Sequence, residues 1–213
     1  TEPVMIIGYD GIINNLKAFS EIWPIKHVVV TRLADYIPGG GVSSAAELGL
    51  KPGWHYFADL LAKTESCVRP RINIDPLKDP AVIQFTGGTT GTPKGATLSH
   101  YNVVAATHAA YYWGRTLIGR IPEAERNVLC LVPYCHVYGQ GNCMGSGILA
   151  ASTQIILPRF EINEVMDTIA KFEKIVYFPA VPTMLNAIVN HPRAAELDIG
   201  RRITFVGSGA APC

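Results

Sequence analysis

Residues 81–95 read Ala-Val-Ile-Gln-Phe-Thr-Gly-Gly-Thr-Thr-Gly-Thr-Pro-Lys-Gly, and this stretch decides the fold. Its first five residues predict a strand, which runs directly into a loop of glycine and threonine over 86–95. Glycines let the backbone approach a ligand closely and turn amide groups toward one point. Threonine hydroxyls and the ammonium group of Lys94 add donors suited to a polyphosphate. The stretch therefore predicts a strand that feeds a phosphate-binding loop.

Two better-known phosphate loops do not fit. A Walker loop needs Gly-Lys-Ser/Thr, but Lys94 lies between Pro93 and Gly95, and Pro93 has no amide hydrogen to offer a phosphate. A Rossmann fingerprint needs Gly-x-Gly-x-x-Gly before a helix; residues 207–212 come closer, but Pro212 stands at the third glycine. The plain alternative is a surface loop with a stray lysine, and dense Gly/Thr usage after a buried strand argues against it.

Outward from this loop, short apolar runs alternate with helical patterns. Ser99 is the expected N-cap of a helix that runs to about Leu117. Further strands are expected over 128–132, 153–157, 174–178 and 203–206, with helices over 139–150, 162–169 and 183–190. Toward the N-terminus, strands are expected over 4–7 and 27–31, helices over 12–19 and 56–63, and irregular connections over 35–52 and 67–80. This alternation predicts an α/β fold of layered, mostly parallel sheets with helices on both faces.

Composition narrows the class of protein. The 213 residues are 48% hydrophobic and 16% charged, which suits a large core and argues against disorder. Eighteen basic against seventeen acidic residues give a formal charge of +1 without clusters, so a nucleic-acid partner is not expected. No transmembrane segment or signal peptide is expected. Five cysteines without Cys-x-x-Cys spacing argue against a disulfide scaffold and favour a cytoplasmic location.

The loop over 86–95, followed by Ser-His-Tyr-Asn over 99–102, resembles the signature loop of the adenylate-forming (ANL) superfamily. That superfamily holds acyl-CoA synthetases, luciferases and the adenylation domains of peptide synthetases. Gly87 stands where its members usually have serine. Three further segments follow in family order: Pro-Tyr-Cys-His-Val-Tyr-Gly over 133–139, Phe-Pro-Ala-Val-Pro-Thr over 178–183, and Gly-Ser-Gly-Ala-Ala-Pro over 207–212. The resemblance is weaker before Ala81, and it implies that residues 1–213 form part of an αβαβα AMP-binding domain.

The resemblance implies a function. Family enzymes activate a carboxylic acid with ATP to an acyl-adenylate and pyrophosphate, and most then transfer the acyl group to a thiol, commonly coenzyme A. ATP, Mg²⁺ and coenzyme A are the implied cofactors, and Lys94 and His136 are the implied catalytic residues. The loop residues implied to hold the β- and γ-phosphates are Thr86, Gly87, Gly88, Thr89, Thr90, Gly91 and Lys94. The adenine surface is implied at Gly207, Ser208, Gly209, Ala210, Ala211 and Pro212, with an ordinary turn as the alternative.

The acid site is implied around His136, which related synthetases place at the acyl and carboxylate pocket; the alternative is a buried histidine with satisfied hydrogen bonds. The other pocket candidates are Tyr138, Gly139, Val181 and Met184. No metal-binding residue is assigned, because Cys130 and Cys135 beside His136 lack a fourth ligand at a plausible spacing. Residues 133–139 hold no acidic residue for a substrate ammonium group, so a fatty or aromatic acid is expected rather than an amino acid.

Family members are more than twice this length. A magnesium-binding glutamate, a ribose-binding aspartate and a C-terminal domain with a catalytic lysine would follow the last segment, so these 213 residues alone are not expected to complete thioester formation. A non-catalytic nucleotide- or acyl-binding module is the alternative function, and a phosphotransferase is a less favoured one. The sequence is compatible with a homo-oligomer and predicts no particular oligomeric state.

Overall fold

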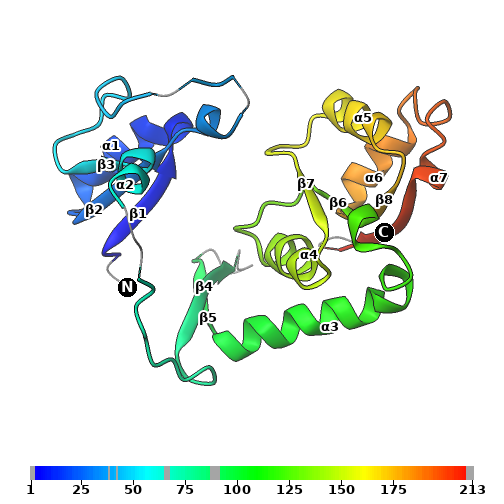
Figure 1. The fold of residues 1–213 in the computed structure, drawn as a ribbon, viewed down its shortest axis with the longest axis horizontal. Helices are drawn as coiled ribbons and strands as arrows, with labels where there is room; N and C mark the ends of the chain where they lie inside the picture. Colours follow the sequence, from blue (N-terminus) through cyan, green and yellow to red (C-terminus); the bar gives the residue numbers. More distant parts are fainter. Residues whose placement is uncertain (1–2, 38, 42, 65–67, 87–91, 210–213) are drawn as a thin grey trace. The chain divides into compact units, whose positions relative to one another are not determined.

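A computed structural model describes residues 3–37, 39–41, 43–64, 68–86 and 92–209. The chain divides into two compact units, Thr1–Ile72 and Asn73–Cys213 (Figure 1). The candidate phosphate loop and the three other motif segments all fall in the second unit. No helix within the described ranges combines the length and the apolar character that a bilayer crossing requires.

The first unit is a three-stranded parallel sheet with two helices. Its strands β1 (Met5–Tyr9), β2 (His27–Thr31) and β3 (Trp54–Tyr56) lie in the order β1-β2-β3. Helix α1 (Ile13–Ile22) connects β1 to β2, and α2 (Phe57–Ala62) follows β3. The expected strands near 4–7 and 27–31 are confirmed, whereas β3 was not expected because three residues are too few for a visible alternation.

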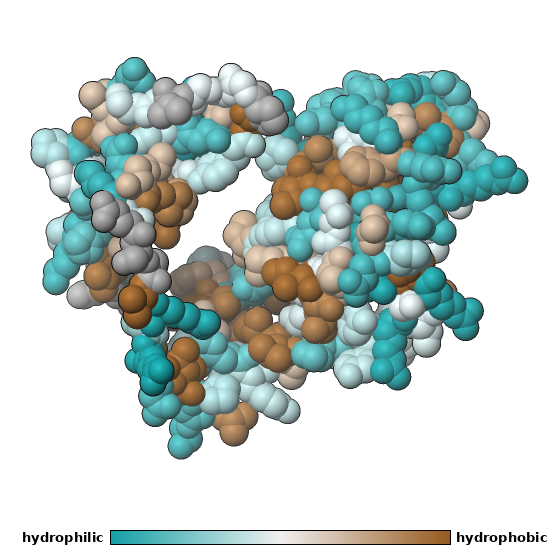
Figure 2. Space-filling view, viewed as in Figure 1, coloured by the Kyte–Doolittle hydropathy of each residue, from teal (hydrophilic) through white to brown (hydrophobic). Residues whose placement is uncertain are grey.

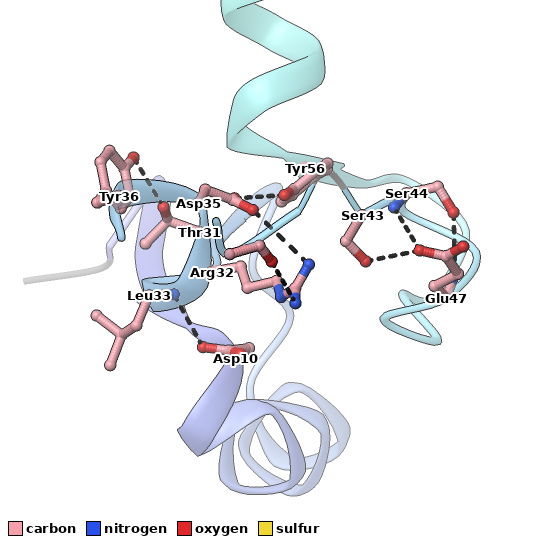
Figure 3. Close-up of polar contacts among 11 residues, drawn as sticks. Asp10, Thr31, Arg32, Leu33, Asp35, Tyr36, Ser43, Ser44, Glu47 and Tyr56 are labelled. Atoms are coloured by element: carbon pink, nitrogen blue, oxygen red, sulfur yellow. Dashed lines mark hydrogen bonds and ion pairs between the residues drawn. The ribbon is translucent and has the colours of Figure 1, made fainter. Parts of the chain in front are cut away.

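Polar side chains fasten the long connection between β2 and β3 (Figure 3). The Asp35 carboxylate accepts a hydrogen bond from the Tyr56 hydroxyl and lies 3.9 Å from the Arg32 guanidinium group. Arg32 in turn donates to the Gly40 carbonyl over 3.3 Å. Burial, together with the Asp35 carboxylate, raises the pKa of Tyr56 to about 12, so its hydroxyl stays a donor. The connection is therefore irregular in backbone but held by specific contacts.

The second unit begins with a hairpin. Strands β4 (Pro80–Thr86) and β5 (Lys94–Ser99) pair antiparallel, with Thr86 opposite Lys94. Helix α3 (His100–Ile118) follows at once, and its N-cap is confirmed: the Ser99 hydroxyl accepts from the Asn102 amide, and the Asn102 side chain accepts from the Ser99 amide. The segment expected only as a brief extended stretch is thus a full strand, and the phosphate loop joins two strands of one hairpin.

A four-stranded parallel sheet forms the rest of the unit. Its order is β7-β6-β8-β9, from β6 (Asn127–Cys130), β7 (Thr153–Ile156), β8 (Ile175–Ala180) and β9 (Ile203–Ser208). Alternate residues of β6 enter two clusters. Leu129 and Leu131 pack with helices α5 (Ile162–Lys171) and α6 (Pro182–Val189), whereas Val128 and Cys130 pack with Cys143. Apolar side chains on both faces confirm the layered α/β fold.

The helix expected over 139–150 differs from the expectation. Residues Gly139–Gly145 form a π-helix, η4, and only Ser146–Leu149 (α4) are α-helical. Gly139, the first residue of this π-helix, is buried directly against the carbonyl groups of Val132 and Pro133. The short helix α7 (Ile199–Arg202) before β9 was not expected. Hydrophobic side chains also reach the surface of this unit (Figure 2), Trp113 of α3 with 88% exposure among them.

Candidate nucleotide and acid site

Three of the four motif segments follow strands of the parallel sheet at the same edge. Residues 133–139 come after β6, residues 178–183 contain the end of β8, and residues 207–209 contain the end of β9. All three strands are parallel, so their carboxyl ends share one edge of the sheet. Ligands of open parallel sheets bind at that edge. The topology therefore gathers at one place segments that lie up to about 70 residues apart in the sequence.

Tyr138 joins two of these segments directly. Its hydroxyl donates a hydrogen bond to the Gly207 carbonyl over 2.9 Å. Its ring lies 3.6 Å from the position that a Cβ atom would occupy at Gly209. The Gly209 amide donates to the Ala180 carbonyl of β8 over 3.3 Å. Burial raises the pKa of Tyr138, so the hydroxyl remains protonated and can keep donating.

His136 is exposed, which sets aside the alternative of a buried histidine. Its Nδ1 atom accepts a hydrogen bond from the Tyr138 backbone amide over 3.1 Å. A neutral imidazole with an accepting Nδ1 carries its proton on Nε2. The ring therefore has a fixed orientation on one side and a hydrogen-bond donor on the other, available to an oxygen of a ligand.

The hairpin contributes Thr86 and Lys94. The Thr86 hydroxyl donates to the Lys94 carbonyl over 3.3 Å, and this bond links the end of β4 to the start of β5 on either side of the loop. The Lys94 side chain is exposed, and no acidic side chain of the described ranges forms an ion pair with it. The other expected phosphate ligands lie outside the described residues: Gly87, Gly88, Thr89, Thr90 and Gly91.

Gln84 connects this hairpin to the histidine segment and was missed in the sequence. Its side-chain amide donates to the Cys135 carbonyl over 3.3 Å, one residue before His136. The available signal was a polar residue within an otherwise apolar strand. Through Gln84 on one side and Tyr138 on the other, residues 133–139 are bonded to both the hairpin and the end of β9.

The expected adenine surface is described only in part. Gly207 and Ser208 end β9 and Gly209 follows it, whereas Ala210, Ala211 and Pro212 lie outside the described residues. A Cβ atom at Gly207 would come 2.7 Å from the Tyr177 hydroxyl, so glycine is needed at this position for Tyr177 to fit. A backbone without side chains was expected at Gly207 for contact with adenine, and in the structure the missing side chain also leaves room for Tyr177.

The residues expected to line the acyl pocket do not all pack against the same core cluster. Tyr138 packs beside the cluster that contains Cys143 and Tyr177. Met184 packs against the other cluster, with the residues of α5, and Val181 is the N-cap of α6. Gly139 is buried under backbone, with Pro133 oxygen 2.2 Å from where its Cβ atom would lie. The structure therefore groups Tyr138 and Gly139 and places Met184 apart from them.

A cavity of about 220 Å³ lies on the Tyr138 side of the sheet. Residues of α3, η4, α4, β8 and β9 all contribute to its lining, which includes Tyr111, Gly114, Asn142, Ser146, Tyr177 and Phe205. The Tyr177 and Phe205 rings stack with centroids 5.2 Å apart and form an aromatic wall. Sequence reasoning missed these residues, because they come from five separate elements and share no motif.

A larger hollow of about 760 Å³ lies elsewhere and is polar. Asn127, Lys174 and Arg202 in its lining stand at the starts of β6, β8 and β9, so the hollow lies at the amino edge of the sheet. Ligands of parallel sheets bind at the opposite edge, so this hollow is not assigned to the substrate. Within the described ranges, no three His, Cys, Asp or Glu side chains lie close enough together to hold a metal ion.

Comparison with known proteins identifies the family to which this chain belongs. The family model described as "AMP-binding enzyme" matches residues 24–213. The long-chain-fatty-acid–CoA ligase of Bacillus subtilis (strain 168) is 37% identical over 161 residues, which are 74% of this chain and 28% of that protein. The 4-coumarate–CoA ligase-like 6 of Arabidopsis thaliana is 31% identical over 134 residues, 63% of this chain and 23% of that protein. The chain thus spans about a quarter of the length of these relatives.

Solved structures share the fold. A red-emitting luciferase from Phrixothrix hirtus superposes with a TM-score of 0.74 at 17% identity, over 99% of this chain and 37% of that one. ATP-bound MatB from Rhodopseudomonas palustris superposes with a TM-score of 0.60 at 19% identity, over 100% of this chain and 46% of that one. At these low sequence identities, the structural similarity is evidence for a shared fold alone.

Proposed function

We propose, from the premise that this chain belongs to the AMP-binding enzyme family, that its residues form part of an AMP-forming acid–CoA ligase. Such an enzyme activates a carboxylic acid with ATP to an acyl-adenylate and then forms a CoA thioester. The observation that carries the proposal is the position of residues 133–139, which Gln84 bonds to the phosphate hairpin and Tyr138 bonds to Gly207. One segment thereby connects the candidate phosphate, acid and adenine sites.

The first step joins two anions. A carboxylate oxygen attacks the α-phosphorus of ATP, the new P–O bond forms, and the bond to the β-phosphate oxygen breaks to release pyrophosphate. The anions repel each other, so catalysis depends on neutralising charge and holding the groups in line. Lys94, exposed and without an ion-pair partner in the described ranges, is suited to the charge that builds on pyrophosphate. The Nε2 donor of His136 is suited to a carboxylate or α-phosphate oxygen.

The residues fit ATP better than they fit a protein-bound metal. Backbone amides, Thr86 and Lys94 suit phosphate oxygens. Within the described residues no acidic cluster lies close enough together to hold Mg²⁺, and the ion would neutralise charge on the phosphates of the nucleotide. Coenzyme A would be the acyl acceptor, as the names of the CoA-ligase relatives suggest. The odd number of cysteines, five without Cys-x-x-Cys spacing, favours a cytoplasmic location.

We expect the acid to be fatty or aromatic. Residues 133–139 contain no carboxylate that could pair with a substrate ammonium group, and leaving such a charge unpaired in a pocket is costly. The names of two relatives agree with this class, since one is a long-chain-fatty-acid–CoA ligase and another a 4-coumarate–CoA ligase-like protein.

The proposal is tested by identifying the nucleotide products of the reaction, with the protein used in the form in which its natural source expresses it. Incubation with ATP and a fatty or aromatic acid should release AMP and pyrophosphate. Lys94→Ala should cost about 2 to 4 kcal/mol of transition-state stabilisation, a fall of about 30- to 1000-fold in kcat/KM. Lys78→Ala is the matched control, because Lys78 is exposed, two residues before β4 and outside the loop. ADP as product would contradict adenylation, and ATP binding without AMP release would favour the non-catalytic module.

A further inference from the structure

The candidate phosphate hairpin is attached to the parallel sheet by few polar contacts. Strands β4 and β5 form a sheet of their own, with two strands. In the part of the chain that the structure describes, one hydrogen bond joins either strand to residues 127–207, and it runs from the Gln84 side-chain amide to the Cys135 carbonyl over 3.3 Å. No ion pair of the described ranges adds to it. Gln84 is therefore the direct polar link between the hairpin and residues 133–139.

Helix α3 is the covalent support of the hairpin, and it is anchored some distance from the loop (Figure 1). Its buried residues, Gly114 and Ile118, lie in its second half. Closer to the hairpin, Thr107 lies against Gly145 of η4. At a rise of about 1.5 Å per residue, Ser99 lies about 12 Å along the helix from Thr107. A tilt of about 5° about that contact would move the hairpin by about 1 Å, so α3 alone does not fix the loop.

On the acid side, Gln84 holds the peptide group that precedes His136. The Cys135 carbonyl belongs to the peptide bond between Cys135 and His136, so any shift of this carbonyl moves His136 with it. The His136 carbonyl accepts from the Gln140 amide over 2.8 Å, and the Tyr138 amide orients the imidazole ring. The Gln84 bond therefore bears on a histidine whose backbone and ring are both already oriented.

On the phosphate side, Gln84 lies in the strand that leads into the loop. Side chains alternate along a strand, so Gln84 and Thr86 share one face of β4. Thr86 in turn pairs with Lys94 across the hairpin. The bond to Cys135 thus holds the hairpin two residues before the first of the proposed phosphate ligands.

We propose that Gln84 is a positioning residue for the adenylation step, a role that rests on the proposed function. In this role it touches neither ATP nor the acid. It acts through the Cys135 carbonyl and keeps His136 at a constant distance from the mouth of the phosphate loop. In-line attack depends on such alignment, and a misplacement of about 1 Å can cost about 100-fold in rate. Because α3 still supports the hairpin, loss of the Gln84 bond should cost less, about tenfold in kcat.

The experiment measures AMP release by the protein as its natural source expresses it, with ATP and palmitic or 4-coumaric acid, whichever the wild type converts faster. Gln84→Met keeps the length of the side chain and removes its donor. Its kcat should fall about tenfold, while the KM values for ATP and acid change less than about twofold, because each ligand keeps its own contacts. Thr97→Val is the matched control. Thr97 is exposed on β5 opposite Ile83, on the other face of the hairpin, and this change should leave kcat and KM unaltered.

A double-variant cycle tests whether Gln84 acts through His136. His136→Ala alone should lower kcat, and adding Gln84→Met should then cost less than about twofold more, because the side chain that Gln84 positions is gone. A further tenfold loss in the His136→Ala background would overturn the inference. A raised KM with an unchanged kcat in Gln84→Met alone would overturn it as well, since that result indicates a ligand contact.

Gln84→Glu is the second variant. It has the size of glutamine, but its carboxylate cannot donate to the Cys135 carbonyl, so it should lower kcat as Gln84→Met does. If both variants unfold at much lower urea concentration than the wild type, Gln84 is a structural residue and the positioning role fails. AMP release by the wild type with no loss of kcat in either variant would refute the inference alone. No AMP from either acid would refute the proposed function, and the inference with it.

Discussion

Gly139 tests the packing of the candidate site most directly. A Cβ atom at this position would lie 2.2 Å from the Pro133 oxygen, 2.6 Å from the Val132 oxygen and 2.7 Å from the Pro133 carbon. Ordinary carbon–oxygen contacts need more than 3 Å, so the Gly139→Ala methyl group must displace backbone rather than a flexible side chain. The site is fully buried between β6 and η4, which leaves no direction for easy relief.

The expected cost is at the upper end of overpacking, about 3 kcal/mol in the free energy of unfolding. With a urea m-value of about 2 kcal/mol/M, the midpoint should fall by about 1.5 M, as followed by circular dichroism. Gly141→Ala is the control two residues along the same π-helix, where a Cβ atom would meet nothing within 4 Å. That change should leave stability unchanged or raise it by up to about 1 kcal/mol. A Gly139→Ala midpoint within about 0.3 M of the wild type would refute the packing argument.

Two further predictions concern helix starts. Ser99→Ala should lower the free energy of unfolding by about 1 kcal/mol in the same urea titration, because the Asn102 amide loses its cap; an unchanged midpoint would remove that role. Glu161 accepts from the amides of Glu164 and Asn163 at the start of α5, and these bonds lower its pKa below the ordinary value of 4.5. A carboxyl with a lowered folded-state pKa stabilises above its unfolded pKa, and loses that contribution as the pH falls through the folded value. The wild type should therefore exceed Glu161→Gln in urea midpoint at pH 7 and match it well below pH 4.5, whereas a constant difference would contradict the assignment.

Elements with local signals were predictable from the sequence. Ser99 and Asn102 mark the start of α3 with a reciprocal cap, and the apolar spacing of Val165, Met166 and Ile169 marks α5. The central strands β6 and β8 were visible as apolar runs because both of their faces are buried. The π-helix was not predictable, because the residue pattern over 139–150 fits an ordinary helix and no local signal in it marks π-type hydrogen bonding.

The candidate site was predictable as motifs but not as a connected structure. The contacts that join the motifs span 51 residues from Gln84 to Cys135 and 69 residues from Tyr138 to Gly207, and they depend on the order of the strands. Met184 follows a motif segment closely in the sequence, but the first turn of α6 directs its side chain to the other core cluster.

The connections through residues 133–139 have a consequence for how the candidate site works. The Tyr138 backbone amide orients His136, while the Tyr138 hydroxyl holds the Gly207 carbonyl. A displacement of Tyr138 would therefore move the group proposed to contact the acid and the backbone proposed to contact adenine at the same time. In-line attack requires the carboxylate and the α-phosphate to keep a fixed relative position. Tyr138 therefore links the support of the acid-binding side chain to the support of the nucleotide-binding backbone, and this link favours a constant geometry between the two ligands.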